Sequence, residues 1–224
     1  MIANDKQFNS KRYSKQFTVT SPDIFRVNRV LEMIGQGKSV LDLGCGDGFL
    51  MKKIQAVGNS VEGIEVSTPA IRHARKQGLK VYDLSLNTPW AALIKKHYDA
   101  VFAGELIEHI YDTDMLLEEI RKVLKKNGSL IITTPNLASL GRRILLLLGK
   151  NPLIENTMRT NDAGHIRYFT KDTLIRLLHD NGFELLEYHS GVVNFDSSGK
   201  FYSLLLASLL PTLGNTLIIK AMKR

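Results

Sequence analysis

The stretch that decides the fold is Val40-Leu41-Asp42-Leu43-Gly44-Cys45-Gly46-Asp47-Gly48. An apolar run of strand length, residues 39–43, leads into a turn dense in glycine and then into a helical pattern over residues 49–56. Strand, glycine loop and helix in this order are typical of the first unit of a doubly wound α/β domain, which binds a nucleotide-like cofactor at the carboxyl end of that strand. The glycines matter because a side chain would hold the backbone away from the ligand, and because tight turns often need positive φ.

The glycine spacing narrows the cofactor. The glycines stand at 44, 46 and 48, and Phe49 occupies the place where a dinucleotide-binding G-x-G-x-x-G would have its third glycine. With Asp42 two residues ahead, the order resembles motif I of the class I S-adenosylmethionine (SAM) methyltransferases. That resemblance implies that the loop, Cys45 included, backs the methionine part of SAM. A tight turn in an unrelated α/β protein is the alternative, and the order of the residues argues against it.

Two further acids follow predicted strands. Glu65 ends the strand predicted over residues 60–65, and Asp83 ends the one over residues 79–84. A carboxylate beside the first strand can accept both ribose hydroxyls of a cofactor. Nicotinamide enzymes carry an acid there too, so Glu65, with Val66 after it, does not discriminate. The resemblance implies that Asp83 accepts from the adenine amino group and that the Leu84 amide lies on the ring, whereas a turn-starting aspartate is the alternative.

A fourth strand, residues 98–103, runs into Gly104-Glu105-Leu106-Ile107-Glu108-His109. This segment resembles the C/G-E-x-L-E-H sequence of ubiquinone-biosynthesis-type O-methyltransferases and their small-molecule relatives, and it adds Gly104 to the cofactor set. The resemblance covers nearly residues 20–190. Its motifs are specific for the cofactor and weak for the methyl acceptor.

The same segment holds the candidate catalytic residues. On a helical turn Glu105, Glu108 and His109 would share one face, and His165 begins a segment on the acceptor side. An oxygen acceptor must lose its proton, either to a general base or through a metal that acidifies the hydroxyl. The set resembles the Mg²⁺ ligands of small-RNA 3′-terminal 2′-O-methyltransferases. Three interpretations stay open: a divalent-cation site formed by all four residues, His109 or His165 as a simple base, and structural hydrogen bonding.

The βα rhythm predicts a seven-stranded, mostly parallel, Rossmann-like methyltransferase sheet whose last two strands form an antiparallel end. We expect one domain over residues 1–224, with an N-terminal arm (1–20) and acceptor-side insertions near 137–164 and 195–212. Other elements are expected as helices over 21–34, 67–76, 89–96, 112–125 and 171–179, and strands over 129–136, 183–189 and 216–222.

Both insertions are apolar. Arg142 and Arg143 stand beside the run 144–148, and residues 201–210 form a second apolar patch. Such segments suit a phosphate-bearing amphiphile or an anionic membrane surface. A small helix packed on the core is the alternative for the first of them.

Composition sets outer bounds. The net charge of +8 favours an anionic partner. The single cysteine excludes a disulfide or a cysteine metal cluster within one chain and fits a reducing cytoplasm. The polar start, residues 1–20, has no apolar core of a signal peptide, and no apolar run approaches the ~20 residues of a membrane span. We therefore expect a cytoplasmic protein with peripheral membrane contact as an option.

These patterns predict a SAM-dependent methyltransferase that acts on a hydroxyl of a small or lipid-linked molecule. Within the class, the alternative is a nucleic-acid 2′-O-methyltransferase, against which the chain offers no RNA-binding domain. From other classes, the alternatives are an NAD-dependent oxidoreductase, disfavoured by Phe49, and a non-catalytic SAM-fold binding protein. The intact cluster at residues 105–109 argues against the last of these.

Overall fold

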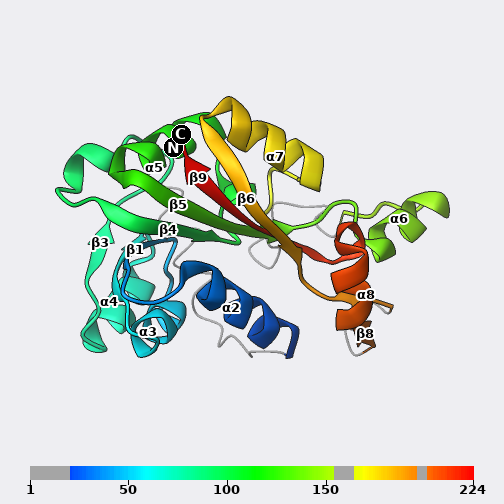
Figure 1. Ribbon diagram of the computed structural model, residues 1–224, viewed down its shortest axis with the longest axis horizontal. Helices are drawn as coiled ribbons and strands as arrows, with labels where there is room; N and C mark the ends of the chain where they lie inside the picture. Colours follow the sequence, from blue (N-terminus) through cyan, green and yellow to red (C-terminus); the bar gives the residue numbers. More distant parts are fainter. Residues whose placement is uncertain (1–20, 154–163, 196–200) are drawn as a thin grey trace.

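The computed structural model describes residues 21–153, 164–195 and 201–224 (Figure 1). Within them, seven strands form one sheet in the order β3-β2-β1-β4-β5-β9-β6. The strands are β1 (Ser39–Leu43), β2 (Ser60–Glu65), β3 (Val81–Asp83), β4 (Tyr98–Gly104), β5 (Leu124–Pro135), β6 (Phe183–Ser190) and β9 (Thr216–Lys223). This is the predicted doubly wound, Rossmann-like sheet, with β1 and β4 adjacent at its centre.

Only one strand of this sheet runs against the others. β1 pairs in parallel with β2 and β4, and β4 pairs in parallel with β5. β9 lies between β5 and β6 and is antiparallel to both. The last two strands, β6 and β9, therefore form the antiparallel end of the sheet, as predicted.

Helices cover both faces of the sheet. Figure 1 shows α2, α3 and α4 on one face, with α5 and α7 on the other. Two apolar clusters fill the space between the layers, one with side chains from α2, α3 and α4 and one with side chains from α5 and α7. The helices are α2 (Ser21–Ile34), α3 (Phe49–Ala56), α4 (Thr68–Lys76), α5 (Thr113–Val123) and α7 (Lys171–Asp180). All five were predicted, with ends within two residues.

Two predicted elements differ. Instead of a helix over residues 89–96, the chain forms a single 3₁₀ turn, η1 (Ala91–Leu93). The buried carboxylate of Glu119 accepts hydrogen bonds from the backbone N–H groups of Trp90 and Ala91, at 2.6 and 2.5 Å. These two bonds from α5 satisfy the amides at the start of η1, which have no partner within the turn.

The fifth strand begins earlier than predicted. β5 starts at Leu124, directly after α5, so Asn127-Gly128 lies inside the strand and does not end the helix. The Lys223 ammonium donates to the carbonyls of Arg121 and Leu124, at 2.6 and 3.0 Å. A cation on the last carbonyls of a helix stabilises its end, and this one comes from the last strand of the chain.

The described parts of the two insertions form small elements at one end of the molecule (Figure 1). Every residue of α6 is at least partly exposed, so the alternative of a helix packed on the core is wrong for residues 144–148. The predicted N-terminal arm and the insertion residues 154–163 and 196–200 lie outside the described residues. The small elements are α6 (Leu140–Leu147), β7 (Val193–Asn194), β8 (Tyr202–Ser203), α8 (Leu204–Leu209) and η3 (Pro211–Leu213).

Among the helices of residues 21–153, 164–195 and 201–224, none has the length and apolar composition needed to cross a membrane.

Candidate active site

The glycine loop leaves the carboxyl end of β1 in a conformation that favours glycine. Gly44, Gly46 and Gly48 have φ of +69°, +57° and +86°, a region that residues with a Cβ rarely adopt. A Cβ on Gly48 would also overlap the side chain of Leu79. The backbone amides of Gly44 and Cys45 donate to the Ile64 carbonyl on β2, at 2.8 and 3.1 Å. The loop is therefore tied to the neighbouring strand.

Glu65 lies directly beside this loop. It is buried at the end of β2, where one carboxylate oxygen accepts from the Gly46 amide at 2.9 Å. The other oxygen accepts from the amides of Val66 and Ser67, at 2.9 and 2.8 Å. Three backbone donors therefore fix the carboxylate at the position that the sequence assigned to a ribose-binding acid.

The other predicted cofactor residues lie at the same edge of the sheet. Asp83 pairs in register with Glu65, and the Leu84 amide donates to the Glu65 carbonyl at 3.3 Å. Asp42 is buried near Glu65, and burial, followed by the charge of Glu65, raises the pKa of Asp42 to about 8. The carboxyl groups of Asp42, on β1, and Glu65, at the end of β2, thus lie close together beside the loop.

Cys45 contributes its backbone to the loop while its thiol lies in the core. A Cβ built on Gly63 of β2 would come within 2.5 Å of the Cys45 sulfur and 2.9 Å of the Met51 sulfur. Burial, followed by the charges of Asp42 and Glu65, raises the pKa of the thiol well above its ordinary value. The thiol is therefore a packing group in the described structure.

Gly104 and Glu105 follow β4, next to β1. The Glu105 backbone has φ of +50°, in the left-handed region. Its amide donates to the Thr133 carbonyl at 2.8 Å, and its carboxylate accepts from the Thr133 hydroxyl at 3.0 Å. The Arg26 guanidinium, from α2, lies 2.9 Å from the same carboxylate oxygen. Sequence reasoning missed Arg26, because a single arginine on an amphipathic helix carries no motif.

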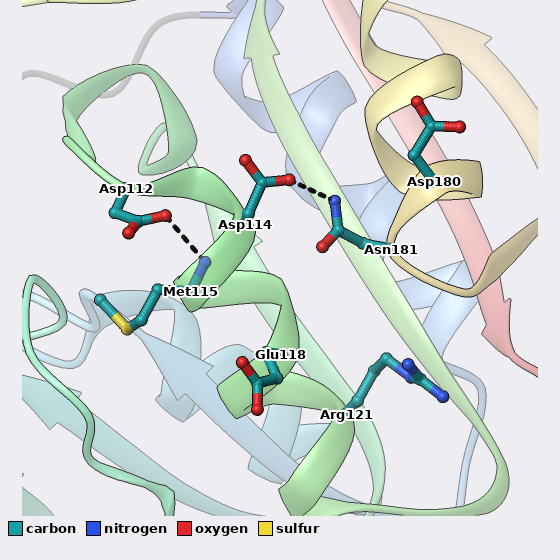
Figure 2. A pocket seen from close by; sticks show the side chains of 7 residues that line it. All are labelled: Asp112, Asp114, Met115, Glu118, Arg121, Asp180 and Asn181. Atoms are coloured by element: carbon teal, nitrogen blue, oxygen red, sulfur yellow. Dashed lines mark hydrogen bonds between the residues drawn. The ribbon is translucent and has the colours of Figure 1, made fainter.

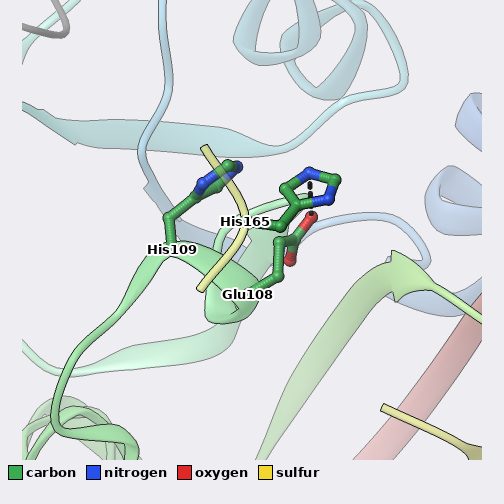
Figure 3. Close-up of side chains that lie close together, drawn as sticks. All are labelled: Glu108, His109 and His165. Carbon is green, nitrogen blue, oxygen red and sulfur yellow. Dashed lines mark ion pairs between the residues drawn. The ribbon is translucent and has the colours of Figure 1, made fainter. Parts of the chain in front are cut away.

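Three of the four candidate catalytic residues meet in one cluster. Ligand atoms of Glu108, His109 and His165 lie within 4.8 Å of one another (Figure 3). Glu108 and His109 belong to the 3₁₀ turn η2 (Ile107–His109), and His165 comes from the segment after the first insertion. The Glu108 carbonyl accepts from the backbone amides of Ile166 and Arg167, at 2.9 and 3.1 Å, which holds that segment in place.

Glu105 lies outside this group. The prediction that Glu105, Glu108 and His109 share a helical face is wrong, because the helical turn begins only at Ile107 and Glu105 has left-handed backbone geometry. Its carboxylate contacts Arg26 and Thr133 instead.

Glu108 has an unusual environment for a carboxyl group. It is buried, and burial followed by the charge of Glu105 raises its pKa to about 8. The Thr134 hydroxyl donates to one carboxylate oxygen at 2.9 Å. The other oxygen lies 3.8 Å from His165 Nε2 and has no hydrogen-bond partner among the described residues. A buried acceptor in that state is uncommon in proteins and points to a ligand or proton at that oxygen.

The imidazole of His109 is oriented by the backbone. Its Nδ1 lies 3.0 Å from the Gly164 carbonyl oxygen. Because a carbonyl only accepts, Nδ1 must carry the proton in this contact, which leaves Nε2 as the atom able to act as base or ligand. The His109 and His165 rings lie with centroids 4.8 Å apart.

A hollow of about 390 Å³ lies elsewhere, between α5 and the end of α7 (Figure 2). Its carboxylates include Asp112, which accepts from the Met115 amide at 2.9 Å, and Asp114, which accepts from Asn181 at 2.7 Å. These contacts cap α5 and join it to α7. None of the lining residues belongs to the glycine loop or to the Glu108 cluster, so the hollow is separate from the candidate site.

Comparison with known proteins identifies the family. Residues 24–188 match the family described as "Methyltransferase domain". The chain belongs to the class I SAM-dependent methyltransferases. The match extends from the second turn of α2 to β6 and contains every candidate site residue named above. The family's cofactor is therefore SAM.

Named relatives agree with this assignment. The methyltransferase is 35% identical over 129 residues to a protein of Pelagibacter ubique named "Ubiquinone biosynthesis O-methyltransferase", a match that covers 56% of this chain and 52% of that protein. It is 29% identical over 157 residues to the human mitochondrial protein of that name, covering 66% of this chain and 42% of that one. The chain thus corresponds to about half of the length of these relatives.

Solved structures share the fold. A SAM-dependent methyltransferase from Mesorhizobium loti superposes with a TM-score of 0.64 at 17% identity, covering 91% of this chain and 98% of that one. Magnesium protoporphyrin IX methyltransferase from Synechocystis, solved with bound S-adenosylhomocysteine (SAH), gives 0.62 at 15% identity, covering 100% and 99%. At these identities the likeness supports the fold of the methyltransferase alone.

Proposed function

We propose that this methyltransferase moves the methyl group of SAM to a hydroxyl oxygen of a small or lipid-linked molecule. The observation that carries the proposal is the cluster of Glu108, His109 and His165 just beyond the end of β4, one strand away from the glycine loop. Methyl transfer from a sulfonium needs alignment above all, but a hydroxyl acceptor also has to lose a proton. The cluster supplies groups that suit that task.

The proposed cofactor-binding residues lie mainly at the carboxyl ends of β1, β2 and β3. The loop glycines have positive φ, and the carboxylate of Glu65 lies beside them, where it accepts from the Gly46 amide. We propose that Glu65 accepts the ribose hydroxyls and that Asp83 and Leu84 face the adenine. The full proposed set is Asp42, Gly44, Cys45, Gly46, Gly48, Glu65, Val66, Asp83, Leu84 and Gly104.

The donor set of the cluster fits a divalent cation. The partnerless oxygen of Glu108 is a ligand atom, and the Gly164 carbonyl holds His109 by Nδ1 in the manner of a supporting contact behind a metal ligand. Oxygen and imidazole without thiolate suit Mg²⁺, Mn²⁺ or Fe²⁺ better than a structural zinc. Glu108, His109 and His165 would hold the ion, and Glu105 would join only after leaving Arg26 and Thr133. A bound cation would lower the pKa of the acceptor hydroxyl.

The same residues can act without a cation. With Nδ1 on the Gly164 carbonyl, Nε2 of His109 can act as a general base for a hydroxyl proton. Glu108, with its raised pKa, can hold a proton at neutral pH, and its partnerless oxygen lies 3.8 Å from His165 Nε2. We propose that the residues of the cluster remove the proton of the acceptor hydroxyl. The chelation experiment below distinguishes a bound cation from a histidine base.

The names of the relatives support a proposal for the acceptor class. An O-methyltransferase of ubiquinone biosynthesis acts on a hydroxyl, and we propose a hydroxylated ring with an apolar substituent as the acceptor here. We further propose that the chain works as one methyltransferase domain in which the residues of the two insertions form the acceptor side.

The test measures cofactor binding and transfer separately. Calorimetry with SAH and with NAD establishes the cofactor, and methyl transfer from labelled SAM is measured to catechol, to a long-chain alkylcatechol and to a short RNA. We expect SAH to bind, NAD not to bind, and the alkylcatechol to be the best of the three acceptors. Methylation of the RNA alone would contradict the acceptor class and favour the nucleic-acid alternative, while NAD binding without SAH binding would contradict the whole proposal.

Chelation distinguishes the interpretations of the cluster. Activity that is lost in EDTA and restored by Mg²⁺ or Mn²⁺ supports the cation. Activity that is indifferent to EDTA but lost in His109→Ala or His165→Ala supports a base. Full activity in Glu108→Ala, His109→Ala and His165→Ala would leave the cluster a structural one.

A further inference from the structure

Two helices that are far apart in the sequence lie at one end of the molecule. Figure 1 shows α6 and α8 at the same end of the molecule, and both contact β7. The Thr212 carbonyl in η3, just after α8, accepts from Arg143 of α6 at 3.3 Å and from the Asn136 side chain at 3.0 Å. Asn136 also donates to the Gly214 carbonyl at 2.8 Å. These bonds hold the two helices as one unit against the exit of β5.

This unit exposes apolar side chains. Leu147 is 87% exposed and Leu205 is 71% exposed, values that are usual for lysine and rare for several leucines in one place. We call the set the leucine surface: Ile144, Leu145, Leu146, Leu147 and Leu148 on and after α6, with Leu204, Leu205, Leu209 and Leu210 on and after α8. Exposed aromatic rings border it on the β7–β8 side, where the Phe195 amide donates to the Phe201 carbonyl.

Within the described residues 137–153 and 201–215, which carry the leucine surface, the charged side chains have one sign. The described residues 137–153 contain Arg142, Arg143 and Lys150 and no carboxylate, and residues 201–215 contain no charged side chain. Leucines with aromatic rings and cations at their border are the composition of a surface that lies in the headgroup region of an anionic bilayer. In a two-fold dimer the same surface would place these cations against copies of themselves, and the described residues 137–153 and 201–215 offer no acid to pair them.

We infer that the leucine surface docks the methyltransferase onto an anionic lipid bilayer. The inference rests on the proposed function, because docking on a bilayer would bring a lipid-linked acceptor to the site. Asn136 lies two residues after Thr134, the residue that donates to Glu108, so the docked unit and the cluster share the end of β5. An acceptor whose apolar chain stays in the bilayer could then present its hydroxyl to the cluster.

Vesicle flotation with the full chain tests the inference. Vesicles of phosphatidylcholine with phosphatidylglycerol are compared with vesicles of phosphatidylcholine alone, at low and high salt. Leu147→Glu and Leu205→Glu should each weaken binding about tenfold or more. Each substitution removes an apolar side chain that would be buried in the bilayer and adds a negative charge, which the anionic lipid repels. Lys150→Gln should weaken binding to the anionic vesicles about fivefold. Leu93→Glu is the matched control, since Leu93 is 62% exposed on η1, away from the surface.

The outcomes are distinct. Binding that requires the anionic lipid, falls with salt, is lost in the two glutamate variants and persists in Leu93→Glu supports docking. Lack of binding by the unaltered protein at low salt, or equal loss in Leu93→Glu, overturns it. A dimer in light scattering that Leu147→Glu dissociates overturns it in favour of contact between copies of this chain. SAH calorimetry without vesicles reports the cofactor part of the proposed function separately, so a failed docking test leaves that result standing.

Discussion

The guanidinium of Arg26 lies 2.9 Å from the carboxylate of Glu105, so the first described helix is joined by an ion pair to the backbone turn that follows β4. Glu105 keeps a left-handed φ of +50° there, a conformation that costs a non-glycine residue about 1 kcal/mol or more. Contacts to Arg26 and Thr133 hold it, and the next turn of chain carries Glu108. The ion pair therefore links α2 to the position of the cluster.

Replacing Arg26 should disturb the cluster more than it disturbs the fold. Arg26→Ala removes a partly exposed ion pair, with side chains 27% and 33% exposed, so we expect a loss of about 1 kcal/mol or less in unfolding free energy. The rate of methyl transfer should fall by more than this small loss of stability explains, because Glu105 can then leave its position beside Glu108. Arg29→Ala is the control, since its pair with Glu32 at 2.8 Å lies within α2. Equal rates for the two variants would mean that the link to Glu105 has no functional effect.

Glu65→Gln should weaken SAH binding. The amide keeps the shape of the side chain, but its NH₂ group would face one of the amides of Gly46, Val66 or Ser67, and the charge that attracts two hydroxyls is lost. Loss of a charged acceptor costs about 1.5–3 kcal/mol, which corresponds to a roughly ten- to hundredfold higher Kd in calorimetry. Asp83→Asn should cost about 1 kcal/mol at most. A Kd that stays the same in Glu65→Gln would remove this carboxylate from the cofactor site.

Glu62 should make the protein sensitive to acid. Burial raises the pKa of its carboxyl group, but hydrogen bonds from Tyr82, Tyr98 and Lys96, together with the contact to Lys80, outweigh burial and lower the pKa to about 2. A group whose pKa is lowered by folding stabilises the fold above its unfolded pKa, about 4.3, and loses that contribution as the pH falls toward 2.

The matched variant is Glu62→Gln. At pH 7 it should be less stable than the unaltered protein by roughly 1–3 kcal/mol in urea unfolding. The difference should shrink between pH 4.5 and pH 2, where the carboxylate of the unaltered protein takes up its proton. A difference that does not change with pH would show that shape and packing, and not charge, explain the role of Glu62.

The sequence predicted the sheet and the cofactor edge because both depend on local patterns. Strand-length apolar runs at a regular βα spacing, and glycines and acids at strand ends, belong to single segments of chain. The errors occur where a distant residue decides. The first amides of η1 bind Glu119 of α5, and the end of α5 is satisfied by Lys223 from β9, and neither of these distant partners can be read from the local pattern.

The cluster was predicted only in part, because the sequence shows the spacing of its residues and not the distant contacts that position them. The E-x-x-E-H spacing placed Glu108 and His109 together, and the position of His165 after an insertion pointed to the acceptor side. Periodicity alone also placed Glu105 on the same face, which assumed a regular helical turn. The positive φ of Glu105 comes from its bonds to β5 and α2, which no spacing within residues 104–109 encodes.

Thr134→Val tests how Glu108 works. Burial and the charge of Glu105 raise the pKa of Glu108 to about 8, and the hydrogen bond from Thr134 opposes that rise. Valine keeps the shape of threonine and removes the donor, so the pKa should rise further and less Glu108 should be ionised at pH 7. Thr133→Val is a comparison variant on the same strand: its hydroxyl donates to Glu105 instead, so it loosens Glu105 and leaves the hydrogen bond to Glu108 intact.

The expected result for Thr134→Val is unchanged SAH affinity, methyl transfer that is slower by about tenfold, and a pH–rate profile whose rise lies at higher pH than in the unaltered protein. If Glu108 is a cation ligand, a higher concentration of Mg²⁺ or Mn²⁺ should restore the rate, because a cation favours the ionised carboxylate. If Glu108 only supports a histidine base, added cation should have no effect. A rate and profile equal to those of the unaltered protein would show that the ionisation of Glu108 has no part in the reaction, and proton removal would then have to be assigned to His109 or His165 alone.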